Sequence, residues 1–210
     1  RRTLENLAMV QPTFFMNVPK AYEFLVAAFP DNPHVRRNLF ARLKLLQYAG
    51  AGLAQHVFDG LAEAARAETG ERILIITGYG STETAPFAFT TTWAVEEAGH
   101  IGLPAAGMSI KLVRNGEKHE LRLKGPNVTP GYWRDPEKTA EAFDDEGYYC
   151  IGDAVRFADP ESLDQGLVFD GRVTEDFKLS TGTWVNFASV RSSVIAACAP
   201  LIRDVVVTGL

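Results

Sequence analysis

The chain has 210 residues, of which 46% are hydrophobic and 22% are charged, and its net charge is −5. This composition is typical of a globular protein, and the length suits one large domain or two small ones. Because acidic and basic residues are interleaved without a basic stripe, we expect no nucleic-acid partner. No apolar run approaches the roughly 18–20 residues of a membrane-spanning helix, so no membrane span is expected.

The cysteines and histidines are few and scattered. Cys150 and Cys198 are far apart and lack the spacing of a metal site, so we interpret both as free thiols in a reducing cytoplasm. The four histidines stand singly, which indicates neither a zinc site nor a Ser–His or Cys–His pair for nucleophilic catalysis.

Hydrophobic patterning predicts alternating strands and helices over residues 1–80. Pro19 starts the first predicted helix, Pro30 and Pro33 end it, and Gly70 is the expected C-cap of the second. Strand–helix–strand order of this kind is typical of a parallel βαβ sheet. The expected strands are residues 12–19, 43–49 and 73–77, and the expected helices are residues 19–29 and 53–69.

The stretch Ile73–Pro86 joins a strand that is apolar on both faces to a glycine-rich segment. Gly78 and Gly80 permit a tight turn and the close approach of a ligand. Ligands of open α/β sheets bind just past the carboxyl ends of the strands. Gly50 and Gly52 follow the preceding strand in the same way, so both glycine pairs are expected at one edge of the sheet and in a shared cleft.

The residues around these glycines suit a nucleotide. The Tyr79 ring can face a base, the Thr82 hydroxyl can donate to a phosphate oxygen, and Glu83 can hold Mg²⁺, which prefers oxygen ligands. From the local chemistry alone, a strand followed by a turn with surface hydroxyls (Ser81, Thr82 and Thr84) is an equally good interpretation.

After residue 98 the pattern changes to short alternating segments, which predicts a small antiparallel barrel or sheet. Asn115-Gly116 is a turn signal, and Asp135-Pro136 is a typical helix start. The expected strands are residues 110–114, 120–124, 148–151, 154–157 and 167–169, and the expected helix is 138–143. Beyond residue 172 we expect a hairpin from 176–179 and 184–187, a helix over 188–198 and a strand beginning within 201–210.

Six motifs, in order along the chain, resemble the adenylate-forming, AMP-producing acyl-CoA synthetases, whose superfamily also contains firefly luciferases and the adenylation domains of peptide synthetases. Because all six motifs occur in the order found in that family, together they are far more specific evidence of the resemblance than any single motif. The motifs are Gly78-Tyr-Gly-Ser-Thr-Glu-Thr84, Gly99-His-Ile-Gly-Leu-Pro104, His119–Pro126, Pro130-Gly-Tyr-Trp133 with Pro136–Phe143, Tyr148-Tyr-Cys-Ile-Gly-Asp153, and Asp170-Gly-Arg172 with Lys178 and Gly182.

The resemblance implies an α/β fold with three parts. These are the second half of a large-domain parallel sheet over residues 1–98, a β-barrel-like subdomain over 99–171, and the hinge and start of a small α+β C-terminal domain over 172–210. It also implies a two-step ligase that uses ATP, Mg²⁺, coenzyme A and a small carboxylic acid. The carboxylate attacks the α-phosphate of ATP to give acyl-AMP, and the thiol of coenzyme A then displaces AMP.

The resemblance assigns roles to particular residues. Thr82 would bond the α-phosphate, Glu83 would bind Mg²⁺, and Asp153 would accept hydrogen bonds from both ribose hydroxyls. The remaining residues would contact adenine, ribose or the acyl group: Gly50, Ala51, Gly52, Gly78, Tyr79, Gly80, Ser81 and Arg172.

Each residue also has a structural interpretation. Asp153 after a glycine is a common turn residue, Arg172 can form a surface ion pair, and the Tyr79 ring can pack on the sheet. We assign Gly131-Tyr132-Trp133 to structure, since nothing in that segment is poised for chemistry. Pro86, Phe87 and Phe89 suit either an aromatic pocket or the core.

The chain departs from the family pattern in several places. The family's pyrophosphate loop would precede Arg1 and its catalytic lysine would follow Leu210, so we expect a piece of an enzyme that is inactive alone. Exposed strand edges in such a piece favour association, including a homo-oligomer. Thr174 replaces the charged hinge residue of the family, and Ile151 replaces the usual threonine before Gly-Asp.

The segments Asp170–Val185 and Tyr48–Leu53 resemble the feruloyl-CoA synthetase branch, which implies a hydroxycinnamate such as ferulate as the acid. No second carboxylate follows Glu83 to pair with an amino group, which argues mildly against an amino-acid substrate. Two alternatives stay open: an adenylation domain of a peptide synthetase, and a non-catalytic nucleotide-binding module.

Overall fold

The computed structural model describes residues 2–115, 118–175, 177–179, 181, 183–198, 201–202 and 205–208. The chain divides into two compact units, and each is described by itself. One unit comprises Arg1–Gly78 with Thr91–Gly99, and the other comprises Tyr79–Thr90 with His100–Leu210.

The first unit contains three parallel strands in the order β1-β2-β3, as the βαβ pattern predicts. The middle strand pairs with both neighbours, so that Phe15, Leu46 and Ile75 lie in one row across the sheet. The strands are β1 (Phe14–Asn17), β2 (Leu45–Ala49) and β3 (Leu74–Tyr79). The helices are α1 (Arg2–Met9), α2 (Pro19–Ala28), α3 (Pro33–Phe40) and α4 (Gln55–Thr69).

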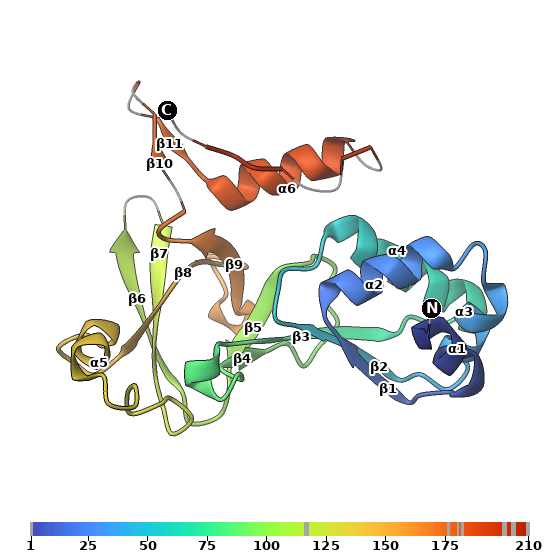
Figure 1. The fold of residues 1–210 in the computed structure, drawn as a ribbon, viewed down its shortest axis with the longest axis horizontal. Helices are drawn as coiled ribbons and strands as arrows, with labels where there is room; N and C mark the ends of the chain where they lie inside the picture. The colour runs from blue at the N-terminus through green and yellow to red at the C-terminus, as the bar shows by residue number, and fades with distance from the viewer. Residues whose placement is uncertain are drawn as a thin grey trace. The chain divides into compact units, whose positions relative to one another are not determined.

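Helices α2 and α4 lie side by side against the sheet (Figure 1). Gly60 permits their close approach, because a Cβ atom there would lie 2.7 Å from Cγ1 of Val26. The buried Tyr22 hydroxyl donates to the carbonyl oxygens of Phe15 and Gln47 at 2.9 and 2.7 Å, which ties α2 to β1 and β2. Gly70 ends α4 in the left-handed conformation, as predicted for its C-cap.

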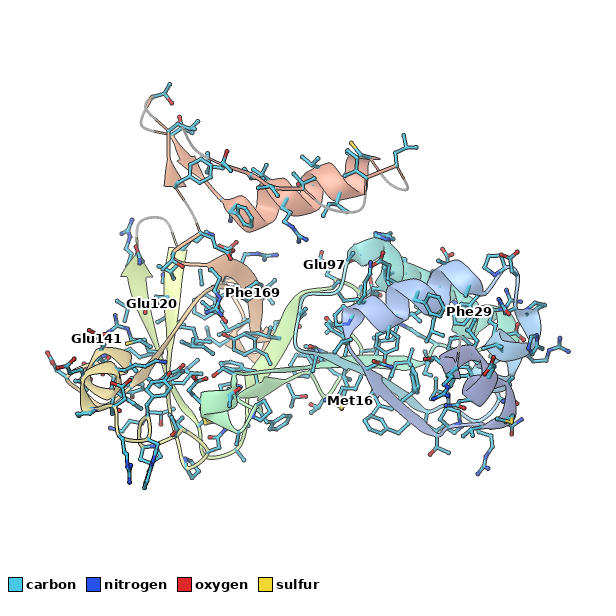
Figure 2. The ribbon with its side chains drawn as sticks, viewed as in Figure 1. Met16, Phe29, Glu97, Glu120, Glu141 and Phe169 are labelled. Carbon is cyan, nitrogen blue, oxygen red and sulfur yellow. The ribbon has the colours of Figure 1, made fainter. Side chains whose placement is uncertain are left out.

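The core of this unit lies between the helices and one face of the sheet. Phe29 belongs to this core, whereas Met16 on β1 is exposed (Figure 2). On α2, Tyr22 is buried in this core, whereas the Phe24 side chain is exposed.

Helices α1 and α3 are corrections to the predicted element order. Pro33, interpreted as a helix breaker, instead begins α3, because proline at a first helical position lacks only a hydrogen bond that the helix does not use. Val35, Leu39 and Phe40 of α3 are buried in the core.

The second unit is built on antiparallel strands in the order β4-β5-β9-β8-β7-β6. Among the described residues this sheet is open, so of the two predicted forms, a barrel or a sheet, the open sheet is the one found, and the mixed α/β class is confirmed. The strands are β4 (Phe89–Thr90), β5 (His100–Pro104), β6 (Ser109–Asn115), β7 (Lys118–Lys124), β8 (Tyr149–Phe157) and β9 (Leu167–Arg172). The helical segments are η1 (Thr82–Thr84), α5 (Pro136–Ala142) and η2 (Leu163–Gln165).

Two local predictions in this unit have clear outcomes. The Asp135 side chain accepts a hydrogen bond from the backbone N–H of Lys138, which confirms the predicted cap of α5. The two strands predicted at 148–151 and 154–157 form one strand, β8, because Gly152 at φ 76° carries it through a change of register. Of the predicted Asn115-Gly116 turn, Gly116 lies outside the described residues.

The described residues beyond Arg172 form a small hairpin and one helix. The predicted hairpin is confirmed in shorter form, since β10 (Phe177–Lys178) pairs antiparallel with β11 (Trp184–Val185). Helix α6 (Phe187–Cys198) matches its prediction, and Gly182 of the family motif lies outside the described residues. The strand predicted within 201–210 is wrong for residues 205–208, because β-forming side chains specify a strand only where a neighbouring strand supplies the pairing.

Candidate adenylate site

Three predicted site residues of the second unit meet in one cluster. The Tyr79 hydroxyl donates to Oδ2 of Asp153 at 2.6 Å, and Nη1 of Arg172 lies 3.1 Å from Oδ1 of the same carboxylate. Arg172 also donates to the carbonyl oxygen of Ile151 at 3.0 Å. The predicted residues from three motifs therefore converge on one carboxylate.

The backbone explains why Asp153 points into this cluster. Gly152 before it takes the left-handed conformation at φ 76°, which other residues rarely adopt. The pairing of β8 with β9 places Asp153 opposite Arg172, and the register shifts between Asp153 and Val155. Such irregularities often re-aim a side chain beside a functional site.

Burial shifts the pKa values of two groups in this cluster. Burial raises the pKa of the Asp153 carboxyl, and the hydrogen bond from Tyr79 and the charge of Arg172 act in the opposite direction. Burial also raises the pKa of Tyr79 far above its ordinary value, and the nearby Asp153 charge adds to the rise. Asp153 is 8% exposed, whereas the Arg172 side chain is 53% exposed and therefore partly solvated. A buried acceptor with one partly solvated cationic partner is suited to binding hydroxyl donors.

The Tyr79 ring lies among other aromatic rings. Its centroid is 5.8 Å from that of Phe89 in an edge-on arrangement and 6.3 Å from that of Phe169. Phe89 is fully buried and belongs to the core, while Phe87 is 43% exposed. The sequence left open whether these phenylalanines line an aromatic pocket or belong to the core. For Phe89, the core interpretation is correct.

The glycine-rich segment ends in the turn η1. Gly80 is required there, because a Cβ atom would lie 2.6 Å from Oγ1 of Thr84 and 2.9 Å from the amide nitrogen of Phe87. Oγ1 of Thr84 accepts from the backbone N–H of Ser81 at 2.9 Å and donates to its carbonyl oxygen at 3.0 Å. Thr84 is therefore a buried structural hydroxyl, while Thr82 at the start of η1 is exposed.

Glu83 is held from a distant part of the chain. The Tyr132 hydroxyl donates to Oε1 of Glu83 at 2.9 Å. A hydrogen bond from its own backbone N–H, and then the Tyr132 hydroxyl, lower the pKa of Glu83, so the carboxylate is anionic at neutral pH. The sequence analysis assigned Tyr132 to structure. The contact could not be foreseen, because 49 residues separate Tyr132 from Glu83 and no spacing rule links them.

The remaining predicted site residues belong to the first unit. Gly50, Ala51 and Gly52 follow β2, and Gly50 has φ 85°. Ala49 at the end of β2 lies opposite Gly78 in β3, so the segment after β2 leaves the sheet at the edge where β3 ends. Parallel strands therefore bring these predicted glycines to one edge.

A shallow hollow of about 640 Å³ lies elsewhere in the second unit, lined by residues 130–136 with Thr139 and Ala140. Trp133, one of the lining residues, is 86% exposed, and the lining includes neither Asp153 nor Arg172. The candidate site is therefore the cluster of Tyr79, Asp153 and Arg172, and not this hollow.

Comparison with known proteins decides the family. Residues 1–133 match the family described as AMP-binding enzyme. The chain belongs to this family. It is 33% identical over 152 residues to a feruloyl-CoA synthase of Amycolatopsis sp, a match that covers 68% of the chain and 28% of that protein. It is 32% identical over 159 residues to human long-chain-fatty-acid–CoA ligase 1, covering 72% of the chain and 21% of that protein.

Two solved structures share the fold of the chain. ATP-bound MatB from Rhodopseudomonas palustris has a TM-score of 0.69 at 25% identity, covering 93% of the chain and 37% of that protein. A malonyl-CoA ligase with methylmalonyl-CoA and AMP bound has a TM-score of 0.64 at 26% identity, covering 96% and 42%. The chain spans between about a fifth and two fifths of the length of these proteins. The family resemblance predicted from the motifs is thus confirmed.

Proposed function

We propose that the protein containing this chain is an acid–thiol ligase that activates a carboxylic acid with ATP and transfers the acyl group to coenzyme A. The convergence of Tyr79 and Arg172 on the buried Asp153 carboxylate carries this proposal. Family membership and the ATP, AMP and acyl-CoA bound to the two similar structures support it.

In the first step, an oxygen of the substrate carboxylate attacks the α-phosphorus of ATP, and pyrophosphate leaves with the electrons of the broken P–O bond. In the second step, the thiol of coenzyme A loses its proton and its sulfur attacks the acyl carbon, and AMP leaves. Pre-organised groups around the phosphate are the main catalytic device in such reactions. This chain would supply part of them, and we propose that the chain alone is inactive.

We propose that Asp153 and Arg172 bind the ribose. A carboxylate with two oxygens can accept hydrogen bonds from two adjacent hydroxyls. When a ribose binds, its hydroxyls would take over the acceptor positions that Tyr79 and Arg172 now fill. The Tyr79 ring and the segments with Gly50, Ala51, Gly52, Gly78, Gly80 and Ser81 would then contact adenine and the acyl group.

We propose that Thr82 and Glu83 meet the phosphates. Thr82 is exposed at the start of η1, so its hydroxyl is accessible to a phosphate oxygen. The described residues contain no cluster of three or more histidine, cysteine or acidic side chains. One anionic carboxylate still fits Mg²⁺, which is usually bound by one or two carboxylates together with substrate phosphates. The ion would neutralise charge on the phosphates during transfer.

For the acid, we propose a hydroxycinnamate such as ferulate. The identity to a feruloyl-CoA synthase supports this choice, as does the likeness of Asp170–Val185 and Tyr48–Leu53 to that branch. Two free cysteines, Cys150 and Cys198, are consistent with a reducing compartment, and we propose the cytoplasm. Among the described residues, no helix combines the length and hydrophobicity needed to cross a bilayer.

The test is an ATP–pyrophosphate exchange assay on the full-length natural protein with ferulate, benzoate, decanoate and phenylalanine. We expect exchange to be fastest with ferulate and to depend on added Mg²⁺. Exchange with phenylalanine alone would support a peptide-synthetase adenylation domain instead. ATP binding without exchange for any acid would support a nucleotide-binding module and contradict the ligase.

A further inference from the structure

The segment that follows β7 holds the turn that carries Glu83. The backbone N–H of Thr129 donates to the carbonyl oxygen of Glu83 at 2.7 Å. The Asn127 side-chain amide donates to the carbonyl oxygens of Thr84 and Phe87 at 2.9 and 2.7 Å. With the bond from Tyr132 to the Glu83 carboxylate, this segment contacts both the backbone and the side chain of the turn. We call residues 127–132 the clamp segment.

Tyr132 is itself fixed by helix α5. Its backbone N–H donates to Oγ1 of Thr139 at 2.9 Å, and the same hydroxyl donates to the carbonyl oxygen of Asp135 at 2.7 Å. Gly131 makes this approach possible, because a Cβ atom there would lie 2.5 Å from Cγ2 of Thr139. The Lys138 ammonium lies 4.4 Å from the Tyr132 ring centroid, so a cation–π contact holds the ring as well.

A tyrosine hydroxyl is well suited to orient a carboxylate that must keep its charge. It donates one hydrogen bond to one oxygen and carries no charge at neutral pH, unlike lysine or arginine. The side chain of Glu83 is thereby restricted without being neutralised. Restricting a group before its ligand arrives lowers the entropy lost on binding.

We propose that Tyr132 is a positioning residue that aims the Glu83 carboxylate at the Mg²⁺-bound phosphates, with the clamp segment holding the backbone of η1. This inference rests on the proposed function, in which Glu83 meets that ion. The segment Gly131-Tyr132-Trp133, which we assigned to structure from the sequence, thereby contributes a residue that acts on the candidate site.

The test compares Tyr132→Phe with Tyr148→Phe in the full-length natural protein. Both variants lose one hydroxyl, but the Tyr148 ring lies beneath the ammonium groups of Lys111 and Lys124, in another part of the unit. The first measurement is hydrogen–deuterium exchange. We expect Tyr132→Phe to accelerate exchange at the hydrogen-bonded amides of Thr84, Ala85 and Phe87, with Tyr148→Phe unchanged there. Equal exchange in Tyr132→Phe and the wild type would overturn the clamp.

The second measurement is calorimetric binding of ATP with and without Mg²⁺. Because partners that orient a metal ligand typically contribute 10–100-fold to metal affinity, we expect Tyr132→Phe to weaken Mg·ATP binding by about tenfold. Binding of ATP without Mg²⁺ should change by less than about twofold, since that binding does not use Glu83. An equal loss in both conditions would mean a general structural role and would overturn the inference.

A double-mutant cycle separates action through Glu83 from any other route. In a Glu83→Gln background, adding Tyr132→Phe should leave Mg·ATP affinity unchanged, because the oriented carboxylate is already gone. A full additional loss would overturn the inference. Thr139→Val, which removes the acceptor for the Tyr132 N–H, should act in the same direction as Tyr132→Phe. If the folded wild type binds no ATP, the proposed function fails, and the exchange measurement still decides whether the clamp exists.

Discussion

At the scale of single residues, the sequence motifs identify candidate site residues, but they do not show which side chains the fold brings into contact. Gly152 is explained by its left-handed φ of 76°, and Gly80 is explained by the close contacts that a Cβ atom would make there. Asp153 belongs to the motif Tyr148–Asp153, so the sequence marked it as a candidate site residue, and its role in binding ribose stays a proposal. The contact between Tyr132 and Glu83 could not be predicted, because no local pattern connects residues that only the fold brings together.

Gly80 and Gly52 form a matched pair for testing this interpretation of the turn. A Cβ atom at Gly80 meets Thr84 and the Phe87 backbone at 2.6–2.9 Å, whereas one at Gly52 meets nothing within 4 Å. We therefore predict that Gly80→Ala lowers the free energy of unfolding by roughly 1–3 kcal/mol through overpacking. Gly52→Ala should be neutral or slightly stabilising, since it only restricts the unfolded chain. Equal stability of the two variants in chemical denaturation would contradict this account.

At the scale of elements, periodicity located the long helices and the parallel strands well. Helix α4 and strands β2 and β3 were predicted because each buries a regular apolar pattern. Helix α3 was missed because Pro33 was interpreted as an end, although the buried Val35 and Leu39 follow it at helical spacing. Short strands such as β4 have too few residues to show a period.

An ion-pair cluster joins several elements of the antiparallel sheet. Oδ2 of Asp144 lies 2.6 Å from Nζ of Lys111 on β6 and 3.1 Å from Nη1 of Arg122 on β7. Its Oδ1 accepts from the backbone N–H groups of Glu146 and Tyr148 at 3.1 and 2.9 Å. The hydrogen bond from Lys111, followed by that from the Tyr148 backbone, holds the pKa of Asp144 well below its ordinary value.

This cluster predicts a pH dependence of stability. Because the Asp144 pKa is lower in the folded chain, its contribution is present above the unfolded pKa of about 3.8 and is lost as pH falls toward the folded pKa. Asp144→Asn should therefore be less stable than the wild type at neutral pH and should lose less stability on acidification. Thermal unfolding between about pH 7 and pH 3 measures this difference. Glu141→Gln on α5 makes the same charge change at an exposed position, and an equal effect there would refute the prediction.

At the scale of the whole molecule, the class of fold and the family were predictable because six motifs occur in one order along the chain. Whether the antiparallel sheet is open or closed could not be predicted. Closure depends on which strands pair, and local alternation of side chains does not specify that pairing. The domain boundaries after residues 98 and 171 stay predictions. The acid also stays a proposal, since relatives with different acids are similarly identical to the chain.

The most direct test of the central claim is the binding of a non-hydrolysable feruloyl-adenylate analogue to the full-length natural protein, measured by titration calorimetry for the wild type and Asp153→Asn. The variant keeps the size of the side chain and removes its charge, so it loses charge-assisted hydrogen bonds worth about 1.5–3 kcal/mol. We predict saturable binding by the wild type and affinity weakened roughly 10–100-fold in the variant. Failure of the folded wild type to bind, or equal affinity of the two proteins, would contradict the assignment of Asp153 to an adenylate site.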